Sequence, residues 1–266
     1  MDTHAKVKVL LHLRRNLMPL LLAALACSAG WAAPDEPLPK AEDILDKFVE
    51  VTGGKAAYEN IRNEKWTGNF EFVGKGIKGT ITSYRADPNK SVSNVEVEGI
   101  GAIKQGTDGQ TAWESSPVQG PRIKQGEERA VALREATLRG PLYWRKLYKH
   151  VETVSQETID DQVCYKVVLT PEEGKPETQY YSKKSGLMVK MTSVESNPAG
   201  EIPIETMLSE YKEENGLRQP HKMRHNAMGQ DFLITIDRFD YNVDIPANTF
   251  DVPADVKALP SKLAPK

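Results

Sequence analysis

The sequence is poor in cysteine, with only Cys27 and Cys164 in 266 residues, and it lacks a long apolar run. Residues 17–26 are apolar but too short to span a bilayer as a permanent helix. Four basic residues precede them, and the small residues of ACSAGWAA follow. This order of basic, apolar and small residues is typical of a secretory signal, so we predict a cleaved signal peptide over residues 1–33 and a periplasmic protein.

The point of cleavage decides the fate of Cys27. Cleavage near Ala32 or Ala33 releases a soluble protein, whereas cleavage before Cys27 leaves a cysteine for lipidation and an outer-membrane anchor. The stretch AALACS resembles a lipobox, but Ala24 stands where a large aliphatic residue is usual. We favour the soluble form and keep the lipoprotein as the alternative. In either case Cys164 has no partner for a disulfide within the domain.

The charge balance argues against two classes of partner. Removing residues 1–33 takes away four basic side chains and one acidic side chain, which changes the formal net charge from −2 to −5. A mildly acidic chain is not expected to bind nucleic acid or to be held on an anionic membrane by charge. With 39% hydrophobic and 27% charged residues, the composition is that of an ordinary globular protein and excludes general disorder.

Motifs for nucleotide binding or nucleophilic catalysis are missing or out of context. The sequence has no G-x-S-x-G and no C-x-x-C-H. The stretch GKGIKG over residues 74–79 matches G-x-G-x-x-G, but TITSYR follows it where a dinucleotide site requires a helix. We therefore predict a glycine-rich hairpin there, and no cofactor.

Two further groups of polar residues have a metal or acid/base interpretation and a structural one. His221 and His225 in HKMRH would share a metal ion on a helix, but a strand separates them by about 13 Å, so we expect exposed strand histidines and no metal. Glu127, Glu128 and Glu135 lie in a predicted helix, where acidic residues near the N-terminus favour the helix dipole. We interpret them as a solvated helix face and predict no catalytic residue.

Periodicity changes from helical to strand-like early in the chain. Apolar residues recur at helical spacing in AEDILDKFVEVTGG, a short helix is expected over residues 56–61, and helical signals return over residues 126–148, interrupted by Gly140-Pro141. Strands are predicted at 64–74, 78–86, 91–98, 101–107, 110–116, 150–159, 162–170, 177–182, 187–195, 202–213, 217–227 and 231–241. Asp108-Gly109 is a favoured hairpin dipeptide, and the whole pattern predicts an antiparallel meander.

The short helices are too few to cover the apolar faces of these strands. Trp66, Phe70 and Phe72 alternate with polar residues, so all three are predicted on one strand face. Four helices about 10 Å wide cover roughly four strand equivalents, whereas apolar faces occur on at least seven strands. The remainder must be covered by the sheet closing on itself, by a ligand or by a partner protein. A closed barrel that fills its own interior is the simpler alternative; an apolar cleft closed by helices is the one we pursue.

Several stretches resemble one known family. They are AEDILDKFVEVTGGKAAY, GIKGTI, TDGQTAWESSP, CYKVVLTPEEGKPETQYYSKKSGLMVKM and NVDIPANTFDVP, in order along nearly the whole mature chain. The sequence resembles the LolA/LolB-like lipoprotein-carrier superfamily, particularly the secreted outer membrane lipoprotein-sorting group. The resemblance implies a mainly β domain over residues 34–257, a curved antiparallel half-barrel of about 11–12 strands with a lid of short α-helices, followed by a disordered tail over residues 258–266.

The same resemblance implies binding of hydrophobic ligands without chemistry, but it carries over no individual binding residue. One feature departs from membrane-delivering members: the sequence has no obvious long loop with an exposed apolar tip. From the residues themselves, we predict a cavity lined by aromatic side chains, with core packing as the alternative role for each. The predicted lining residues are Trp66, Phe70, Phe72, Trp113, Tyr143, Trp144 and Tyr148.

Three functions are compatible with these features. The first is a non-catalytic periplasmic carrier for lipids, lipoproteins or other hydrophobic ligands, expected as a monomer that contacts membranes transiently. The second is an envelope assembly protein that binds another polypeptide through its apolar face. An enzyme acting on a hydrophobic substrate has the least support, because the sequence shows no nucleophile, base or metal constellation.

Overall fold

A computed structural model describes residues 37–197 and 200–259. The predicted signal peptide, Cys27 and residues 260–266 of the predicted tail lie outside the described residues. The chain divides into two units, Met1–Pro37 and Leu38–Lys266, and all the helices and strands belong to the described part of the second unit.

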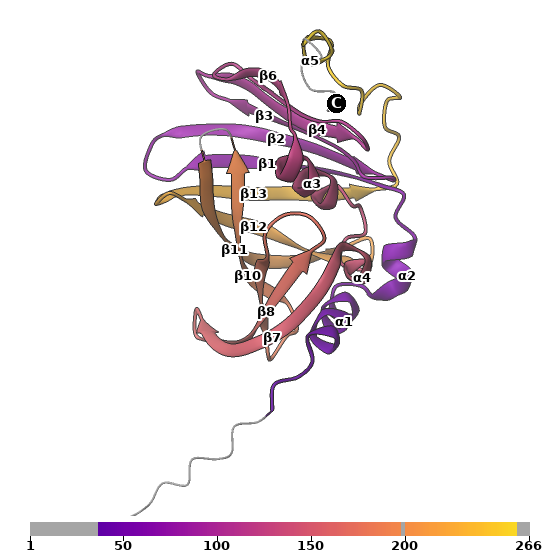
Figure 1. Cartoon of the computed structure of the whole chain (residues 1–266), viewed down its shortest axis with the longest axis vertical. Helices are drawn as coiled ribbons and strands as arrows, with labels where there is room; N and C mark the ends of the chain where they lie inside the picture. Colours follow the sequence, from indigo (N-terminus) through magenta and orange to yellow (C-terminus); the bar gives the residue numbers. More distant parts are fainter. Residues whose placement is uncertain (1–36, 198–199, 260–266) are drawn as a thin grey trace, which may run out of the picture. The chain divides into compact units, whose positions relative to one another are not determined.

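Thirteen antiparallel strands form one curved sheet (Figure 1). In chain order the strands are β1 (Asn63–Phe72), β2 (Ile77–Ala86), β3 (Lys90–Val97), β4 (Gly101–Asp108), β5 (Ala112–Ser116), β6 (Gly120–Ile123), β7 (Tyr148–Ile159), β8 (Gln162–Pro171), β9 (Glu177–Ser182), β10 (Met188–Asn197), β11 (Gly200–Glu214), β12 (Leu217–Ala227) and β13 (Gln230–Tyr241). Consecutive strands are neighbours in the sheet, except that β6 and β7 lie at its opposite edges. The pairing of β1 with β13 joins the two halves.

The order of the strands runs from β6 at one edge to β7 at the other, so the sheet of the described residues is open. The predicted antiparallel half-barrel is confirmed. One strand was not predicted: β6, whose four residues include Pro121. All twelve predicted strands are present with small shifts at their ends.

The turns form where the sequence predicts them. Between β4 and β5, the Asp108 carboxylate accepts hydrogen bonds from the backbone N–H groups of Gln110, at 2.8 Å, and Thr111, at 2.7 Å. Gly109 adopts a φ of +99°, which glycine reaches without steric cost. The GKGIKG stretch covers part of the turn between β1 and β2 and the first three residues of β2, so it belongs to a glycine-rich hairpin as predicted.

Strand register divides the sheet into an inner and an outer face. Side chains of directly paired residues lie on the same face. One such row crosses seven strands through Val167, Gln179, Met191, Thr206, His225, Phe232 and Phe72. This is the inner face, because the first helix packs on Val167 within the hydrophobic core.

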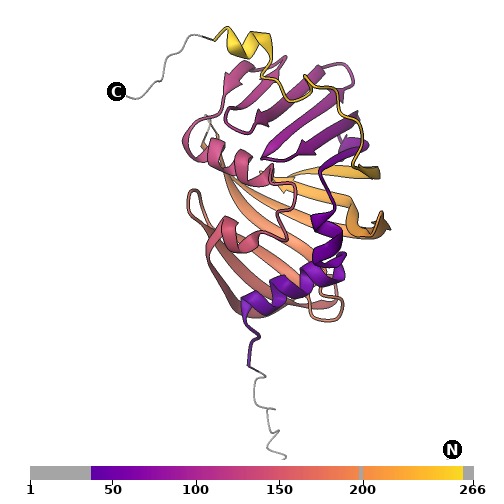
Figure 2. The same ribbon diagram turned by 90° about the vertical axis from the view of Figure 1, so that its right-hand side faces the viewer.

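Four short helices lie on the inner side of the sheet (Figure 2). They are α1 (Ala41–Val51), α2 (Gly54–Glu59), α3 (Gly126–Glu135) and α4 (Trp144–Leu147). The apolar side of α1 packs Ile44 and Leu45 against Val167, Leu169 and Tyr181 of β8 and β9. At the end of α1, Gly53 lies so close to Gly216 that a Cβ atom would stand 2.5 Å from the Gly216 carbonyl oxygen.

A fifth helix, α5 (Ala254–Lys257), was not predicted from the sequence and lies on the outer side. The hydroxyl group of Ser115 in β5 donates a hydrogen bond to Asp255 at 3.1 Å. No helix within the described ranges is long and apolar enough to cross a membrane.

Candidate functional site: an inner trough with a polar chamber

The aromatic side chains of β1 share the inner face, as predicted. Trp66 contacts the ring of Phe239 with centroids 6.5 Å apart, and Phe70 and Phe72 both contact Phe232. These contacts connect the two halves of the sheet across the β1–β13 pair. The prediction of a common face for Trp66, Phe70 and Phe72 is therefore confirmed.

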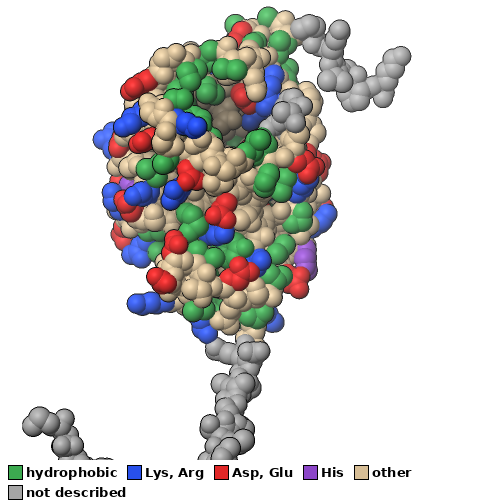
Figure 3. Space-filling model, turned by 90° about the vertical axis from the view of Figure 1, so that its left-hand side faces the viewer, with side chains coloured by type: hydrophobic (Ala, Val, Ile, Leu, Met, Phe, Trp, Pro, Cys, Tyr) green, Lys and Arg blue, Asp and Glu red, His purple; other side chains and the backbone are tan. Residues whose placement is uncertain are grey.

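The far end of the inner face, away from α1, is apolar. Here paired residues of β1 to β4 and of β11 to β13 are mostly hydrophobic and partly exposed. We call this set the apolar mouth: Phe70, Phe72, Ile77, Ile81, Val95, Ile103, Leu208, Met223, Phe232 and Ile234. On the side where the β1–β2 hairpin lies, the surface is hollowed, and both hydrophobic and charged side chains flank the hollow (Figure 3).

Nearer the helices, the same strands carry polar inner-face residues. Trp66 pairs with Ser83, Ser83 with Ser93, and Ser93 with Gln105, so one row of four strands presents an indole, two hydroxyls and an amide. A cavity of about 280 Å³ lies between this row and α3. We call it the polar chamber, and its lining includes Trp66, Ser83, Arg85, Ser91, Ser93, Gln105, Lys124 and Glu135.

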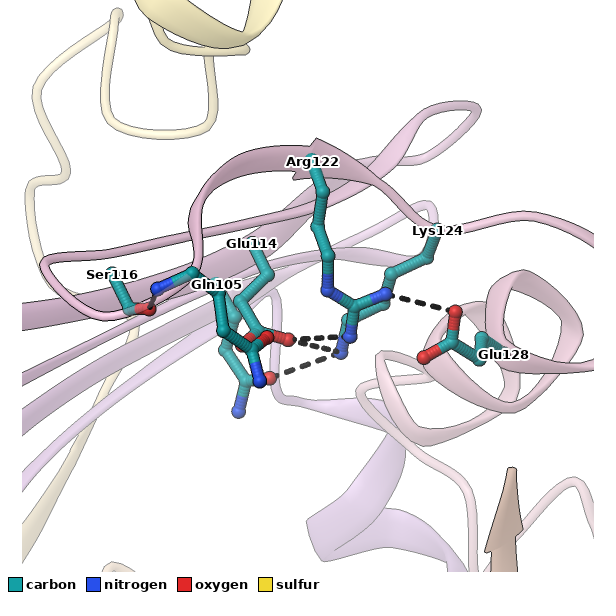
Figure 4. A network of polar contacts seen from close by, with 7 residues as sticks. Gln105, Glu114, Ser116, Arg122, Lys124 and Glu128 are labelled. Carbon is teal, nitrogen blue, oxygen red and sulfur yellow. Dashed lines mark hydrogen bonds and ion pairs between the residues drawn. The ribbon is translucent and has the colours of Figure 1, made fainter. Parts of the chain in front are cut away.

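A network of charges closes the polar chamber on the β6 side (Figure 4). Arg122 lies between two carboxylates, donating to Glu114 at 2.8 Å and to Glu128 of α3 at 2.9 Å. The hydrogen bond with Glu128 raises the pKa of Arg122 above its ordinary value. Lys124 donates to the side-chain oxygen of Gln105 at 3.0 Å. A further cavity of about 260 Å³ adjoins this network and is lined in part by Glu135 and Glu195.

Polar contacts hold α3 across the concave inner face of the sheet, which we call the trough. None of the side chains of α3 is fully buried. On one side it is bonded to Arg122, and on the other Glu127 accepts hydrogen bonds from Ser196 at 2.9 Å and from the backbone N–H of Lys175 at 3.0 Å. The interpretation of Glu127 and Glu128 as a solvated helix face is therefore wrong, because both carboxylates bond to the sheet or its loops.

Glu135, at the end of α3, lines both cavities. Its side chain is exposed to the space between α3 and the inner face of the sheet. Burial raises its pKa to about 7, and the charges of Glu195 and Glu177 add to the shift while Lys124 and Arg134 oppose it. The exposure of Glu135 agrees with the expected solvated helix face, whereas its raised pKa was not predicted. Apolar periodicity did not indicate it, because α3 shows almost no amphipathic pattern.

Two of the predicted aromatic residues lie at a third cavity, of about 210 Å³, near α1. Trp144 and Tyr148 line it together with Phe48 and Met188. The indole N–H of Trp144 donates to Asp46 at 3.1 Å, and burial raises the pKa of Tyr148, next to Glu177. Trp144 also belongs to the core cluster under α1, so core packing accounts for part of its role.

The remaining two predicted aromatic residues lie apart from these cavities. Trp113 pairs with Gly106 and Ile123 and alternates with Glu114, so it lies on the outer face; it is only 2% exposed. Tyr143 packs between the cationic side chains of Arg139 and Lys146. The seven residues thus do not form one lining, and a ligand-binding role for any of them stays a prediction.

The two histidines of HKMRH lie on strand β12, as expected. The expectation of exposure is wrong for His221, which is 1% exposed and contacts the ring of Phe239. His225 shares a hydrogen bond with Thr206 at 2.8 Å, and burial lowers its pKa. Among the described residues, no group of three or more His, Cys, Asp or Glu side chains is placed to hold a metal ion.

The described residues therefore define an open antiparallel half-barrel with cavities between its inner face and its helices. No family model matches the chain, and no curated protein matches its sequence. Among solved structures, a LolA superfamily protein from Nitrosomonas europaea is 14% identical, with 80% of this chain and 98% of that chain covered and a TM-score of 0.55.

Two other structures are similar over a comparable length. A DUF1329 family protein from Desulfovibrio piger is 14% identical, covering 79% of this chain and 97% of its own, with a TM-score of 0.53. A domain described as that of an outer membrane lipoprotein-sorting protein, from Vibrio parahaemolyticus, is 12% identical, covering 79% and 97%, with a TM-score of 0.51. At these identities the likeness concerns the fold, and the protein has a LolA-like fold.

Proposed function

We propose that the protein is a non-catalytic periplasmic carrier or binding protein for lipids, lipoproteins or other hydrophobic ligands of the cell envelope. The observation that carries this proposal is the apolar mouth. Its phenylalanine, isoleucine and methionine side chains line the inner face, and most of them are left partly exposed. Exposed apolar area of this kind on a concave face is typical of ligand-binding or interaction sites.

The free energy of transfer from water favours binding of a hydrocarbon chain at the apolar mouth. Each methylene group transferred from water to an apolar surface contributes about 0.8 kcal/mol, so an acyl chain of ordinary length is held without any specific polar contact. The LolA-like fold of the solved structures supports the proposal, as do the predicted signal peptide and the predicted periplasmic location. The proposal assigns no catalytic step to the protein.

Mass spectrometry of the protein as purified tests this function. The mature protein is isolated gently from an envelope fraction and compared under native and denaturing conditions. A lipid that is present under native conditions and released on denaturation is the expected result. A stoichiometric bound polypeptide would instead support an envelope assembly role, and turnover of an ester or glycan substrate would show an enzyme; either result would overturn the carrier.

Paired substitutions on β1 test the site. Phe70→Asp places a charge on the apolar mouth and should abolish uptake of a fluorescent fatty acid. Thr67→Asp places the same charge on the outer face of the same strand, where Thr67 pairs with Arg238, and should leave uptake unchanged. Far-UV circular dichroism of both variants establishes that they fold. Equal uptake by two folded variants would show that the inner face of β1 does not bind the ligand.

A further inference from the structure

The inner face changes from polar to apolar along the direction of the strands. On β2, residues at inner positions run from Arg85 and Ser83 to Ile81 and Ile77, and on β3 Ser93 is followed by Val95. Two residues of a strand span about 7 Å, so the change occurs within one step of the pattern. A ligand that follows the strands therefore meets both kinds of surface.

The polar rows carry hydroxyl groups that the protein itself does not use. The side chains of Ser83, Ser91 and Ser93 line the polar chamber and form no hydrogen bond with any other residue in the described ranges. Serine at three inner positions of two paired strands contributes little to a core, because hydroxyl groups gain nothing from apolar packing. These groups are free to bond to something else in the chamber.

The cationic groups around the chamber are already paired. Arg85 lies 3.0 Å from Glu64, and Lys124 bonds to Gln105 and lies 3.9 Å from the carboxylate of Glu114. Arg122 is bonded to two carboxylates in the adjoining network. A phosphate or carboxylate entering the chamber would find no uncommitted cation among its described lining residues and would meet Glu135.

Glu135 is also a poor anchor for a cationic head group. It forms no ion pair with another described residue, but its raised pKa leaves it partly protonated near neutral pH. Glu135 is the one carboxylate among the described lining residues, and its charge already interacts with that of Lys124. Uncharged hydroxyl groups satisfy the serines, the Gln105 amide and Glu135 without any charge being buried, and the flat ring of Trp66 offers an apolar surface beside them.

We propose that the polar chamber is a head-group site for an uncharged, hydroxyl-bearing amphiphile whose hydrocarbon chain lies in the apolar mouth. The head group bonds to Ser83, Ser91, Ser93 and Gln105, and glycosyl and glyceryl head groups share this chemistry. This inference rests on the proposed function, because it assigns a direction and a head group to the ligand that the carrier holds.

A series of ligands with one tail and different heads tests the proposal. Binding of decyl β-glucoside, glyceryl monodecanoate, decyl phosphate and decylammonium is measured by isothermal titration calorimetry below their critical micelle concentrations. We expect the glucoside or the glyceryl ester, or both, to bind at least tenfold tighter than either charged compound. Comparing the affinities of the two uncharged compounds shows whether the site prefers a glycosyl or a glyceryl head group.

Variants separate this inference from the carrier function. The Ser83→Ala/Ser93→Ala double variant should lose about tenfold in affinity for the uncharged compounds, as expected for two hydrogen bonds, and little for the charged ones. Thr82→Ala, on the outer face of β2, is the matched control and should bind like the wild type. Phe72→Asp, in the apolar mouth, should weaken the binding of all four compounds.

The outcomes are distinct. If none of the four compounds binds the wild type, the carrier function itself fails. If all four bind alike and the serine substitutions have no effect, the carrier stands and the head-group site is wrong. Tightest binding of decyl phosphate or decylammonium would also overturn the proposal.

Discussion

The ion pair between Glu64 and Arg85 supports one side of the trough, and its disruption gives a sharp prediction. The side chain of Glu64 is 4% exposed, and its carboxylate lies 3.0 Å from Arg85, whose side chain is 32% exposed. The phenol groups of Tyr58 and Tyr241 also feel the charge of Glu64: burial and then this charge raise the pKa of both. Both phenols are neutral at pH 7, so neither can replace the positive charge of Arg85 beside Glu64.

Arg85→Met therefore leaves a buried carboxylate without a counter-charge. Removing one partner of a buried pair costs about 3–5 kcal/mol, and we expect the lower end because Arg85 is one-third exposed. For a domain of this size, about 3 kcal/mol lowers the melting temperature by roughly 6–12 °C. The measurement is urea unfolding followed by tryptophan fluorescence at pH 7, with a thermal scan as a second observable.

Two controls distinguish the lost charge from lost packing. Glu64→Gln leaves Arg85 free to extend toward solvent and should cost less, about 1 kcal/mol. The double variant Glu64→Gln/Arg85→Met should be more stable than Arg85→Met alone, because no charge is left unpaired. A cost below about 1 kcal/mol for Arg85→Met, or a double variant no more stable than that single variant, would refute the reasoning.

Two further predictions concern the sheet and the chamber. At Gly79 a Cβ atom would stand 2.2 Å from the Glu96 carbonyl oxygen. Gly79→Val should therefore destabilise the fold by roughly 1–3 kcal/mol, measured by urea unfolding. The control is Gly140→Ala, which should cost less because the nearest atom to its Cβ is 3.4 Å away. The pKa of Glu135 is raised from 4.5 to about 7, so the folded state loses stability as pH rises through that range. The stability of Glu135→Gln relative to the wild type should therefore increase between about pH 5 and pH 8. A difference in melting temperature that does not change with pH would contradict the raised pKa.

Much of the fold follows from local patterns in the sequence. Period-2 alternation located twelve strands, and Asp108-Gly109 located a hairpin, because both signals depend only on neighbouring residues. Strand β6 was missed because Pro121 argues against a central strand. At the edge of a sheet a proline is tolerated, since its missing N–H faces no partner on the open side.

The site was less predictable, because it depends on which face of each strand is inner. Alternation shows that Trp113 and Glu114 point in opposite directions, but only the pairing of Glu114 with Gln105 shows that Glu114 points inward. The environment of Glu135 depends on where α3 crosses the sheet, and nothing in the helix sequence states this. Burial of His221 likewise follows from its long-range contact with Phe239.

Counting helices against strands predicted an uncovered inner face, and the distribution of the helices explains why its lining is mixed. Helix α1 covers β8 and β9 with apolar side chains and fills that half of the trough. Helix α3 crosses the other half with charged side chains and no fully buried residue, so it leaves space above β1 to β4 instead of filling it. A helix of this composition needs polar partners, and Arg122, Ser196 and the backbone N–H of Lys175 supply them at its two sides. The polar composition of α3 therefore explains both the charged edge of the chamber and the space between this helix and the sheet.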